Sequence, residues 1–224
     1  MRLTKGLVPA AVALLQFFAF PANALTLEIR GDAPSDWILA IGRINVDDDN
    51  RLRELIDLHP ETRTFVIDSD GGNLAAAIGI GSALREHKFT TMVPPDAGCY
   101  SACFFAFVGG TKRIVGVRAE LGVHQFSRDW DGDSPESAQQ HTQLVAAKVL
   151  NHVLAMEVNL AAFEKALNTP PQDMYIFSPE ELDRYGLVGS SIVVHGNPPA
   201  SGDCPWPAGF DFKDPMNLYP GCKR

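Results

Sequence analysis

The stretch "VIDSDGGNLAAAIGIGSALRE", residues 66–86, decides the fold. A short apolar run ends in acidic residues, a pair of glycines follows, and a segment rich in alanine and glycine comes next. The apolar run predicts a strand, and the spacing of Leu74, Ile78 and Leu84 predicts a helix whose small residues allow close packing on a sheet. A strand, a glycine turn and a helix in this order begin a βαβ unit, so the stretch predicts an α/β protein.

The same alternation continues on both sides of this stretch. Predicted strands cover 25–31, 36–44, 63–70, 88–95, 112–117, 121–126 and 187–196, and predicted helices cover 45–60, 71–87, 101–110, 135–158 and 178–186. One helix carries the apolar stripe Val145, Val149, Val153 and Met156, and another begins with the capping-box pair Ser178 and Glu181. Alternating strands and helices imply a mostly parallel sheet, and the length fits a single domain.

The first 24 residues predict a secretory signal peptide. Arg2 and Lys5 form a positive n-region, an apolar run follows, and Ala22 and Ala24 give the A-x-A pattern of a cleavage site. The apolar run is shorter than the ~20 residues that a membrane span needs. We therefore expect a periplasmic or secreted protein with three parts, namely a signal peptide over 1–24, an α/β domain over 25–196 and an irregular Pro/Gly-rich tail over 197–224.

The chain is acidic, with a formal charge of −8 that becomes −10 when the two positive charges of the signal peptide are removed. This charge argues against nucleic acid or an anionic membrane as a partner, and no later segment is apolar enough to span a bilayer. We expect no cofactor and no metal site. Zinc spacing is absent from the cysteines, and "RDWDGDSPES" (128–137) lacks the glycine and distal glutamate of a calcium loop.

Four cysteines, Cys99, Cys103, Cys204 and Cys222, follow the predicted signal peptide. An even number in an exported chain favours disulfides, and three pairings can be drawn. The simplest joins neighbours, Cys99 with Cys103 and Cys204 with Cys222. The second of these bonds would close part of the tail and gain ~3 kcal/mol in the chain-entropy account. A paired cysteine offers no thiolate, so Ser101 between the first two is the better nucleophile.

Three features follow predicted strands, where open α/β sheets place their sites. The Gly71–Gly72 turn leaves backbone N–H groups free at a helix N-terminus, where they can stabilise an oxyanion. Ser101 begins a buried helix after a glycine-containing turn, with the N–H of Ala102 beside it. His124 lies in an apolar strand, where a histidine is more often a structural core residue. Together, however, the serine, the histidine and two N–H groups form an acyl-transfer constellation.

At this point the sequence resembles a known family, the proteolytic subunit of the Clp protease within the Clp/crotonase superfamily, and in particular its exported relatives. The resemblance covers nearly the whole mature chain and rests on an ordered set of segments: "ILAIGRINVDDDNRLRELIDL", "VIDSDGGNLAAAIGIGSALRE", "CYSACFFAFVGGTKRIVG", "ELGVHQF" and "FSPEELDRYGLV". It implies repeated ββα units with a mostly parallel sheet. It also implies Ser101 as nucleophile, His124 as general base, the N–H groups of Gly72 and Ala102 as the oxyanion hole, and amide hydrolysis through an acyl-enzyme.

The third member of the family's triad has no clear match. The family places an aspartate shortly before the "YGL" segment, and counting back from Tyr185 without a gap reaches Met174. A one-residue slip in the loop would let Asp173 serve, and otherwise the site is a Ser–His dyad. The sequence also has "SDGG" where the family usually has a proline before the glycine pair.

These observations predict an exported serine hydrolase, a peptidase that acts on peptides or unfolded protein without an ATPase partner. The resemblance is also compatible with a homo-oligomer. The alternative is a non-catalytic binding or assembly module of the same fold. A crotonase-like acyl-CoA enzyme would use the same oxyanion hole, but acyl-CoA is scarce outside the cytosol, so export disfavours it.

Overall fold

The computed structural model describes residues 24–33, 35–127 and 134–189. Residues 1–23 of the predicted signal peptide, most of the acidic stretch "RDWDGDSPES", and the predicted tail with Cys204 and Cys222 lie outside the described residues. Within the described ranges, every helix is too short or too polar to cross a membrane.

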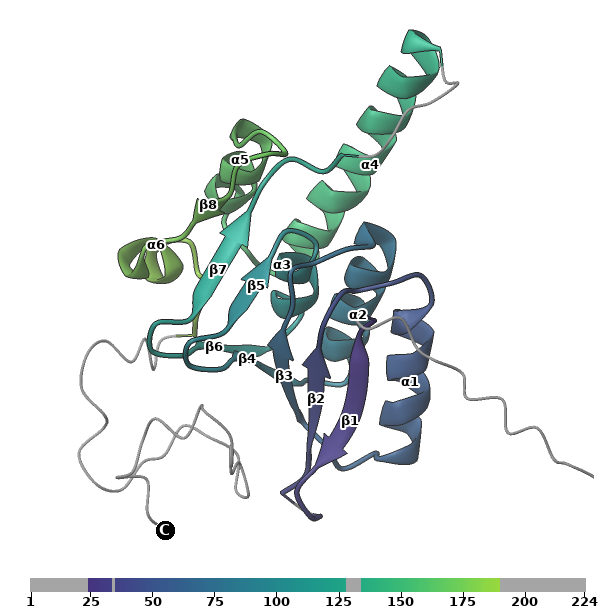
Figure 1. Ribbon diagram of the computed structural model, residues 1–224, viewed down its shortest axis with the longest axis vertical. Coiled ribbons are helices and arrows are strands. Elements are labelled where there is room, and N and C mark those ends of the chain that lie inside the picture. The colour runs from purple at the N-terminus through teal and green to yellow at the C-terminus, as the bar shows by residue number, and fades with distance from the viewer. Residues whose placement is uncertain (1–23, 34, 128–133, 190–224) are drawn as a thin grey trace, which may run out of the picture.

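The main sheet has five strands in the order β1–β2–β3–β4–β6 (Figure 1). Their bounds are β1 Thr26–Arg30, β2 Trp37–Ile41, β3 Thr64–Asp68, β4 Thr90–Val93 and β6 Lys112–Val115. Only β1 runs antiparallel to its neighbour, and the other three pairs are parallel. The predicted α/β class with a mostly parallel sheet is therefore confirmed.

Six helices accompany the described strands. Their bounds are α1 Asp48–Leu58, α2 Leu74–Glu86, α3 Cys103–Phe107, α4 Pro135–Ala155, α5 Leu160–Asn168 and α6 Pro179–Arg184. Strand β3 shows how the core divides: Phe65 and Ile67 belong to the large core shared with α1, α2 and α3, whereas Val66 belongs to a smaller cluster with Trp37 and Met92. This division follows from the two-residue period of a strand, and it makes β3 buried on both faces.

A second sheet, with the order β5–β7–β8, lies beyond the carboxyl end of β3 (Figure 1). Its strands are β5 Gly98–Tyr100, β7 Glu120–Val123 and β8 Tyr175–Ile176. Ser69, just after β3, donates its N–H to the carbonyl of Gly98 at 2.8 Å, which joins the two sheets. The chain thus contains the ββα units β4–β5–α3 and β6–β7–α4, in which the first strand joins the main sheet and the second joins the small one.

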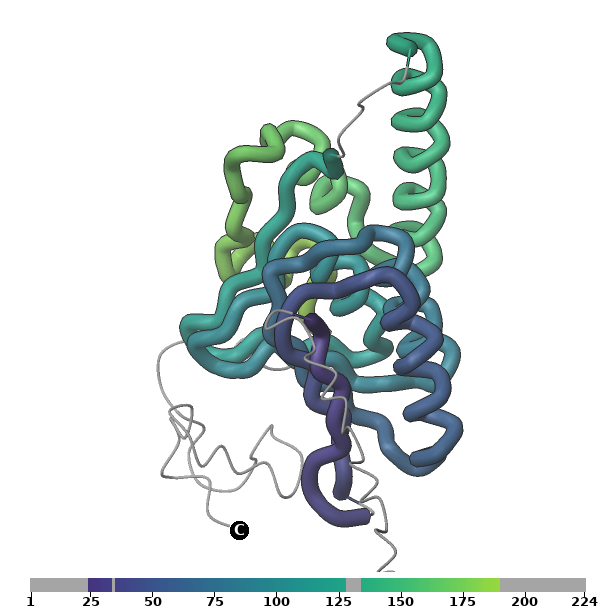
Figure 2. The backbone as a smooth tube through the Cα atoms, turned by 45° about the vertical axis from the view of Figure 1, so that its right-hand side comes forward, coloured from purple at the N-terminus to yellow at the C-terminus, as the bar shows by residue number. Residues whose placement is uncertain are grey.

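Helix α4 packs on the body through its C-terminal half only, and its N-terminal half projects away from the rest of the fold (Figures 1 and 2). Val149, Val153 and Met156 of the predicted stripe are buried. The predicted capping box at the start of α6 is present, with reciprocal hydrogen bonds between Ser178 and Glu181. Of the predicted strand over 187–196, only 187–189 are described, and they form no strand.

Candidate active site

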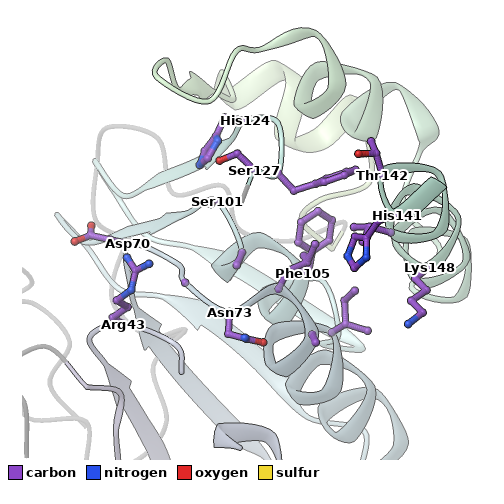
Figure 3. Close-up of a pocket in the computed structure, with 17 residues that line it drawn as sticks. Arg43, Asp70, Asn73, Ser101, Phe105, His124, Ser127, His141, Thr142 and Lys148 are labelled. Atoms are coloured by element: carbon purple, nitrogen blue, oxygen red, sulfur yellow. The ribbon is translucent and has the colours of Figure 1, made fainter. Parts of the chain in front are cut away.

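A cavity of about 650 Å³ opens where the two sheets meet (Figure 3). Four residues predicted from the sequence to form the site, Gly72, Ser101, Ala102 and His124, all line it. They come from the turn after β3, the turn between β5 and α3, and the end of β7. The topology therefore gathers into one cavity residues that are up to 52 positions apart in the sequence.

Ser101 occupies a strained turn between strand β5 and helix α3. Its φ of 57° lies in the left-handed region, which costs a non-glycine residue ~1 kcal/mol or more. The turn is held from both sides, because the N–H of Ser101 donates to the carbonyl of Gly122 at 2.9 Å and its carbonyl accepts from Phe104 at 3.2 Å. A serine on a sharp strand-to-helix turn is the geometry of a nucleophile elbow, which exposes the hydroxyl to substrate.

A disulfide brackets this turn. Cys99, in β5, and Cys103, the first residue of α3, form the bond with their Cα atoms 5.3 Å apart. Both residues are fully buried. The bond closes a five-residue ring with Ser101 at its centre, so the first of the two predicted neighbour pairs is present. The other pair, Cys204 with Cys222, lies outside the described residues.

The glycine turn fits against the serine turn so closely that side chains are excluded. Gly71 has φ 91° and Gly72 has φ 137°, both unfavourable for other residues. A Cβ atom on Gly71 would lie 2.6 Å from the carbonyl oxygen of Tyr100 and 2.8 Å from the backbone nitrogen of Ala102. The two turns are therefore in direct contact, and the glycine pair fixes where the serine turn lies.

Two backbone N–H groups, those of Gly72 and Ala102, are left without an acceptor among the described residues. Their neighbours are engaged: Asn73 donates to the carbonyl of Ile44 at 2.8 Å, and Gly71 donates to the hydroxyl of Ser69 at 3.1 Å. Free N–H groups from two adjoining turns that line one cavity beside a serine can bind an oxyanion.

His124 follows β7 and lines the same cavity, but in the described structure no hydrogen bond joins it to Ser101. The hydroxyl of Ser101 likewise has no hydrogen-bond partner among the described residues, and Nδ1 of His124 is buried without one. The structure thus brings the serine and the histidine to one cavity without placing them in hydrogen-bond contact.

The structure does not bring Asp173 to this histidine. Extending the antiparallel pairing of β7 and β8 by one residue beyond Val123 and Tyr175 puts Met174 opposite His124. Asp173 is exposed, does not line the cavity, and its side chain makes no hydrogen bond or ion pair with a described residue. In the described part of the chain, no carboxylate is hydrogen-bonded to His124.

Several lining residues were not predicted from the sequence. Arg43 and Asp70 lie on one side of Ser101, and His141 and Lys148 lie on the other (Figure 3). The signal for the second pair was their seven-residue spacing on the predicted helix with Val145 between them, which places all three on one face. Within the described ranges, no group of three or more His, Cys, Asp or Glu side chains could hold a metal ion.

Two ionisable groups near the site have shifted pKa values. Burial, a 2.6 Å hydrogen bond to Glu120, and the nearby carboxylates of Asp68 and Asp70 raise the pKa of Tyr100 to about 12, so it stays protonated. Burial lowers the pKa of His152, whose Nε2–H donates to the carbonyl of Phe105 at 2.8 Å. His152 is therefore a neutral structural group that fastens α3 to α4.

The chain is a single-domain α/β protein with a Clp/crotonase-like fold. A solved structure with this similarity is that of the 1510-N membrane-bound stomatin-specific protease, in a serine-to-alanine mutant form. The TM-score is 0.51 at 17% sequence identity, and the match covers 67% of this chain and 75% of the other. No protein-family model matches the sequence, and no curated protein matches it. At this level of identity the similarity shows the fold alone.

Proposed function

We propose that this protein is a serine hydrolase, specifically a peptidase, with Ser101 as its nucleophile. The observation that carries the proposal is the strained, disulfide-bracketed turn that presents Ser101 beside the unpaired N–H groups of Gly72 and Ala102. Backbone strain in a non-glycine residue persists where the surrounding structure enforces it, and such residues cluster at active sites. The protease with a similar fold adds support for peptide chemistry.

The reaction follows from the positions of these groups. Ser101 Oγ attacks the carbonyl carbon of a peptide bond while His124 accepts the hydroxyl proton, and the N–H groups of Gly72 and Ala102 bind the resulting oxyanion. The histidine then gives its proton to the leaving amine, which leaves an acyl group on Ser101. Water attacks this ester by the same route and releases the acid.

His124 is the proposed general base, although its hydrogen bond to Ser101 is not formed in the structure described above. Catalytic hydrogen bonds are often long or misaligned without substrate and shorten in the substrate complex. His124 and Ser101 line the same cavity, and the proposal requires that their side chains come into contact there when substrate binds. Because the described structure puts Met174 opposite His124 and leaves Asp173 exposed outside the cavity, the proposal is a Ser–His dyad.

The proposed setting is the periplasm or the exterior of the cell, where the predicted signal peptide would deliver the protein. An ATP-driven unfoldase cannot work there, so the peptidase would act alone on peptides or unfolded segments. A homo-oligomer is compatible with this proposal, because the projecting half of α4 is exposed.

Labelling with a fluorophosphonate tests the proposal, since this reagent phosphonylates an activated serine. We expect one adduct, on Ser101, that is absent from the Ser101→Ala variant and from denatured protein. Ser82→Ala, which removes a hydroxyl on α2 bonded to the carbonyl of Ile78, is the matched control and should label normally. Folded protein that stays unlabelled under conditions that fully label a control hydrolase would contradict the proposal.

A second candidate function is a non-catalytic peptide-binding module. It is favoured by one observation: in the described structure, His124 makes no hydrogen bond to Ser101 or to a carboxylate. Under this alternative the cavity binds a peptide and releases it intact. Ser101→Ala would then leave both peptide affinity and the function in cells unchanged, whereas the peptidase proposal predicts that function in cells is lost.

A further inference from the structure

The cavity continues from Ser101 toward α4 along an apolar wall. Leu74 and Ile78 of α2, Phe105 of α3 and Val145 of α4 line it, and all four pack against the main core or belong to it. An extended peptide that presents its carbonyl to Ser101 can place a neighbouring side chain against this wall. The wall suits the methylene groups of that side chain.

Lys148 lies at the α4 end of this wall (Figure 3). It follows Val145 by three residues and His141 by seven, so these three side chains share the face of α4 that borders the cavity. Lys148 is exposed and makes no ion pair or hydrogen bond with any described residue. Its ammonium group is thus available to a substrate.

The charges that line the cavity are unevenly distributed. Asp70 is the one carboxylate among the described lining residues, and it lies with Arg43 on the far side of Ser101 from α4 (Figure 3). On the α4 side, His141 and Lys148 are the ionisable ones among the lining residues that the structure describes. The α4 side of the cavity therefore carries the positive charge of Lys148, although the whole chain has a formal charge of −8. A positive charge in a binding cavity favours ligands with a negative charge.

We infer that Lys148 is a specificity-determining residue, and that the cavity prefers peptides with a carboxylate beside the apolar wall. A glutamate side chain supplies both the methylene groups and the charge, and a free C-terminus supplies the charge alone. For cleavage this inference rests on the proposed peptidase function, but the binding preference itself requires no reaction. The chemistry is an ion pair between the Lys148 ammonium group and a substrate carboxylate.

The experiment measures peptide binding to the Ser101→Ala protein, which removes hydrolysis from the measurement. Fluorescence anisotropy gives the affinity for fluorescein-labelled Ala-Leu-X-Ala-Ala-amide with X as Glu, Gln or Lys. We expect the Glu peptide to bind roughly fivefold more tightly than the Gln peptide, the upper range for an exposed ion pair, and the Lys peptide to bind most weakly. High salt should reduce the difference.

Two variants in the same background assign the preference. Lys148→Gln should abolish the difference between the Glu and Gln peptides. Lys112→Gln, which removes the same charge from an exposed residue of β6 outside the cavity lining, should keep it. A Gln peptide with a free C-terminus separates the two carboxylate sources, because tighter binding of this peptide assigns the terminal carboxylate, and tighter binding of the Glu amide assigns the side chain.

Equal affinity for the three amide peptides, absence of binding by all of them, or an unchanged preference in Lys148→Gln would overturn the inference. Loss of hydrolysis of every substrate in Lys148→Gln of the otherwise wild-type chain would also contradict a role in specificity alone. Failure of this inference can be distinguished from failure of the proposed function. Wild-type protein that does not cleave the peptides would refute the peptidase, whereas the binding measurements on Ser101→Ala test the charge preference whether or not cleavage occurs.

Discussion

Reduction of the Cys99–Cys103 disulfide should destabilise the protein and slow the proposed reaction. The bond closes a ring of five residues, since its sequence separation is 4. In the chain-entropy account, a loop of this size lowers the entropy of the unfolded chain enough to stabilise the fold by about 2 kcal/mol at 25 °C. The reduced protein should therefore have a folding equilibrium constant roughly 30-fold lower, by the conversion of about 1.4 kcal/mol for each factor of ten.

The catalytic effect has a separate cause. Ser101 has a φ of 57° and lies between the two bonded cysteines, which restrict its backbone. Without the bond, the turn can relax toward ordinary backbone angles, and relief of ~1 kcal/mol or more of strain would favour arrangements with the hydroxyl displaced. We expect kcat on a peptide substrate to fall several-fold, up to roughly tenfold for 1.4 kcal/mol, and not to vanish.

The disulfide is reduced while the protein is unfolded, and the protein is then refolded. The free energy of unfolding in urea and the rate of peptide hydrolysis are measured for the oxidised and for the reduced, refolded protein. A Cys204→Ser/Cys222→Ser background ensures that only the bond in the turn responds. An unchanged unfolding free energy together with unchanged kcat would refute the reasoning that the bond supports the turn. Complete loss of activity in a folded Cys99→Ser or Cys103→Ser variant would instead indicate a thiol mechanism.

Three further changes probe the site and its supports. Gly71→Ala should lower kcat at least ~100-fold, as loss of an oxyanion donor does, because its Cβ would lie within 2.8 Å of Tyr100 and Ala102. The control is Gly186→Ala, where φ is 64° and an added Cβ would meet nothing within 4 Å. It should cost ~1 kcal/mol of stability and leave kcat unchanged. Comparable kcat values for the two variants would contradict this account. Because burial lowers the pKa of His152, its contribution to stability should be complete above pH 6.5 and should decline below that pH by at most ~1.4 kcal/mol per pH unit. In a plot of unfolding free energy against pH, His152→Gln should flatten this part of the curve. A curve identical to that of the wild type would contradict the assignment. Asp173→Asn should lower kcat/KM less than tenfold, because Asp173 is exposed outside the cavity; a fall of ~10⁴-fold, as for a triad aspartate, would identify it as the third member.

The order of the main strands and helices could be predicted because their apolar runs are long and bounded by turns. Strand β3 and helix α2 follow directly from the stretch around Gly71–Gly72. Strands β5 and β8 were missed because they contain only three and two residues, too few for a periodic pattern. Their sequences, "GCY" and "YI", become strands through pairing with β7, which is tertiary information.

The candidate site likewise combines features that local sequence predicts with features that depend on tertiary contacts. Ser101 and Gly72 could be proposed from sequence because a turn before a buried helix and a glycine pair after a strand are local patterns. The left-handed φ of Ser101 and the contact of Gly71 with Ala102 depend on how two distant turns meet, so no local pattern contains them. Lys148 was missed for a similar reason: its seven-residue spacing from His141 gains meaning only when the fold brings that face of α4 to the cavity of Ser101.

The central claim is that Ser101 forms an acyl-enzyme. The most direct measurement is the intact mass of the protein after rapid acid quenching during turnover of a slowly deacylated p-nitrophenyl ester, followed by peptide mapping. The account predicts a transient added mass of one acyl group, located on Ser101, that disappears as substrate is exhausted and is absent from Ser101→Ala. An added mass on another residue, or turnover with no acyl adduct at any time point, would contradict it.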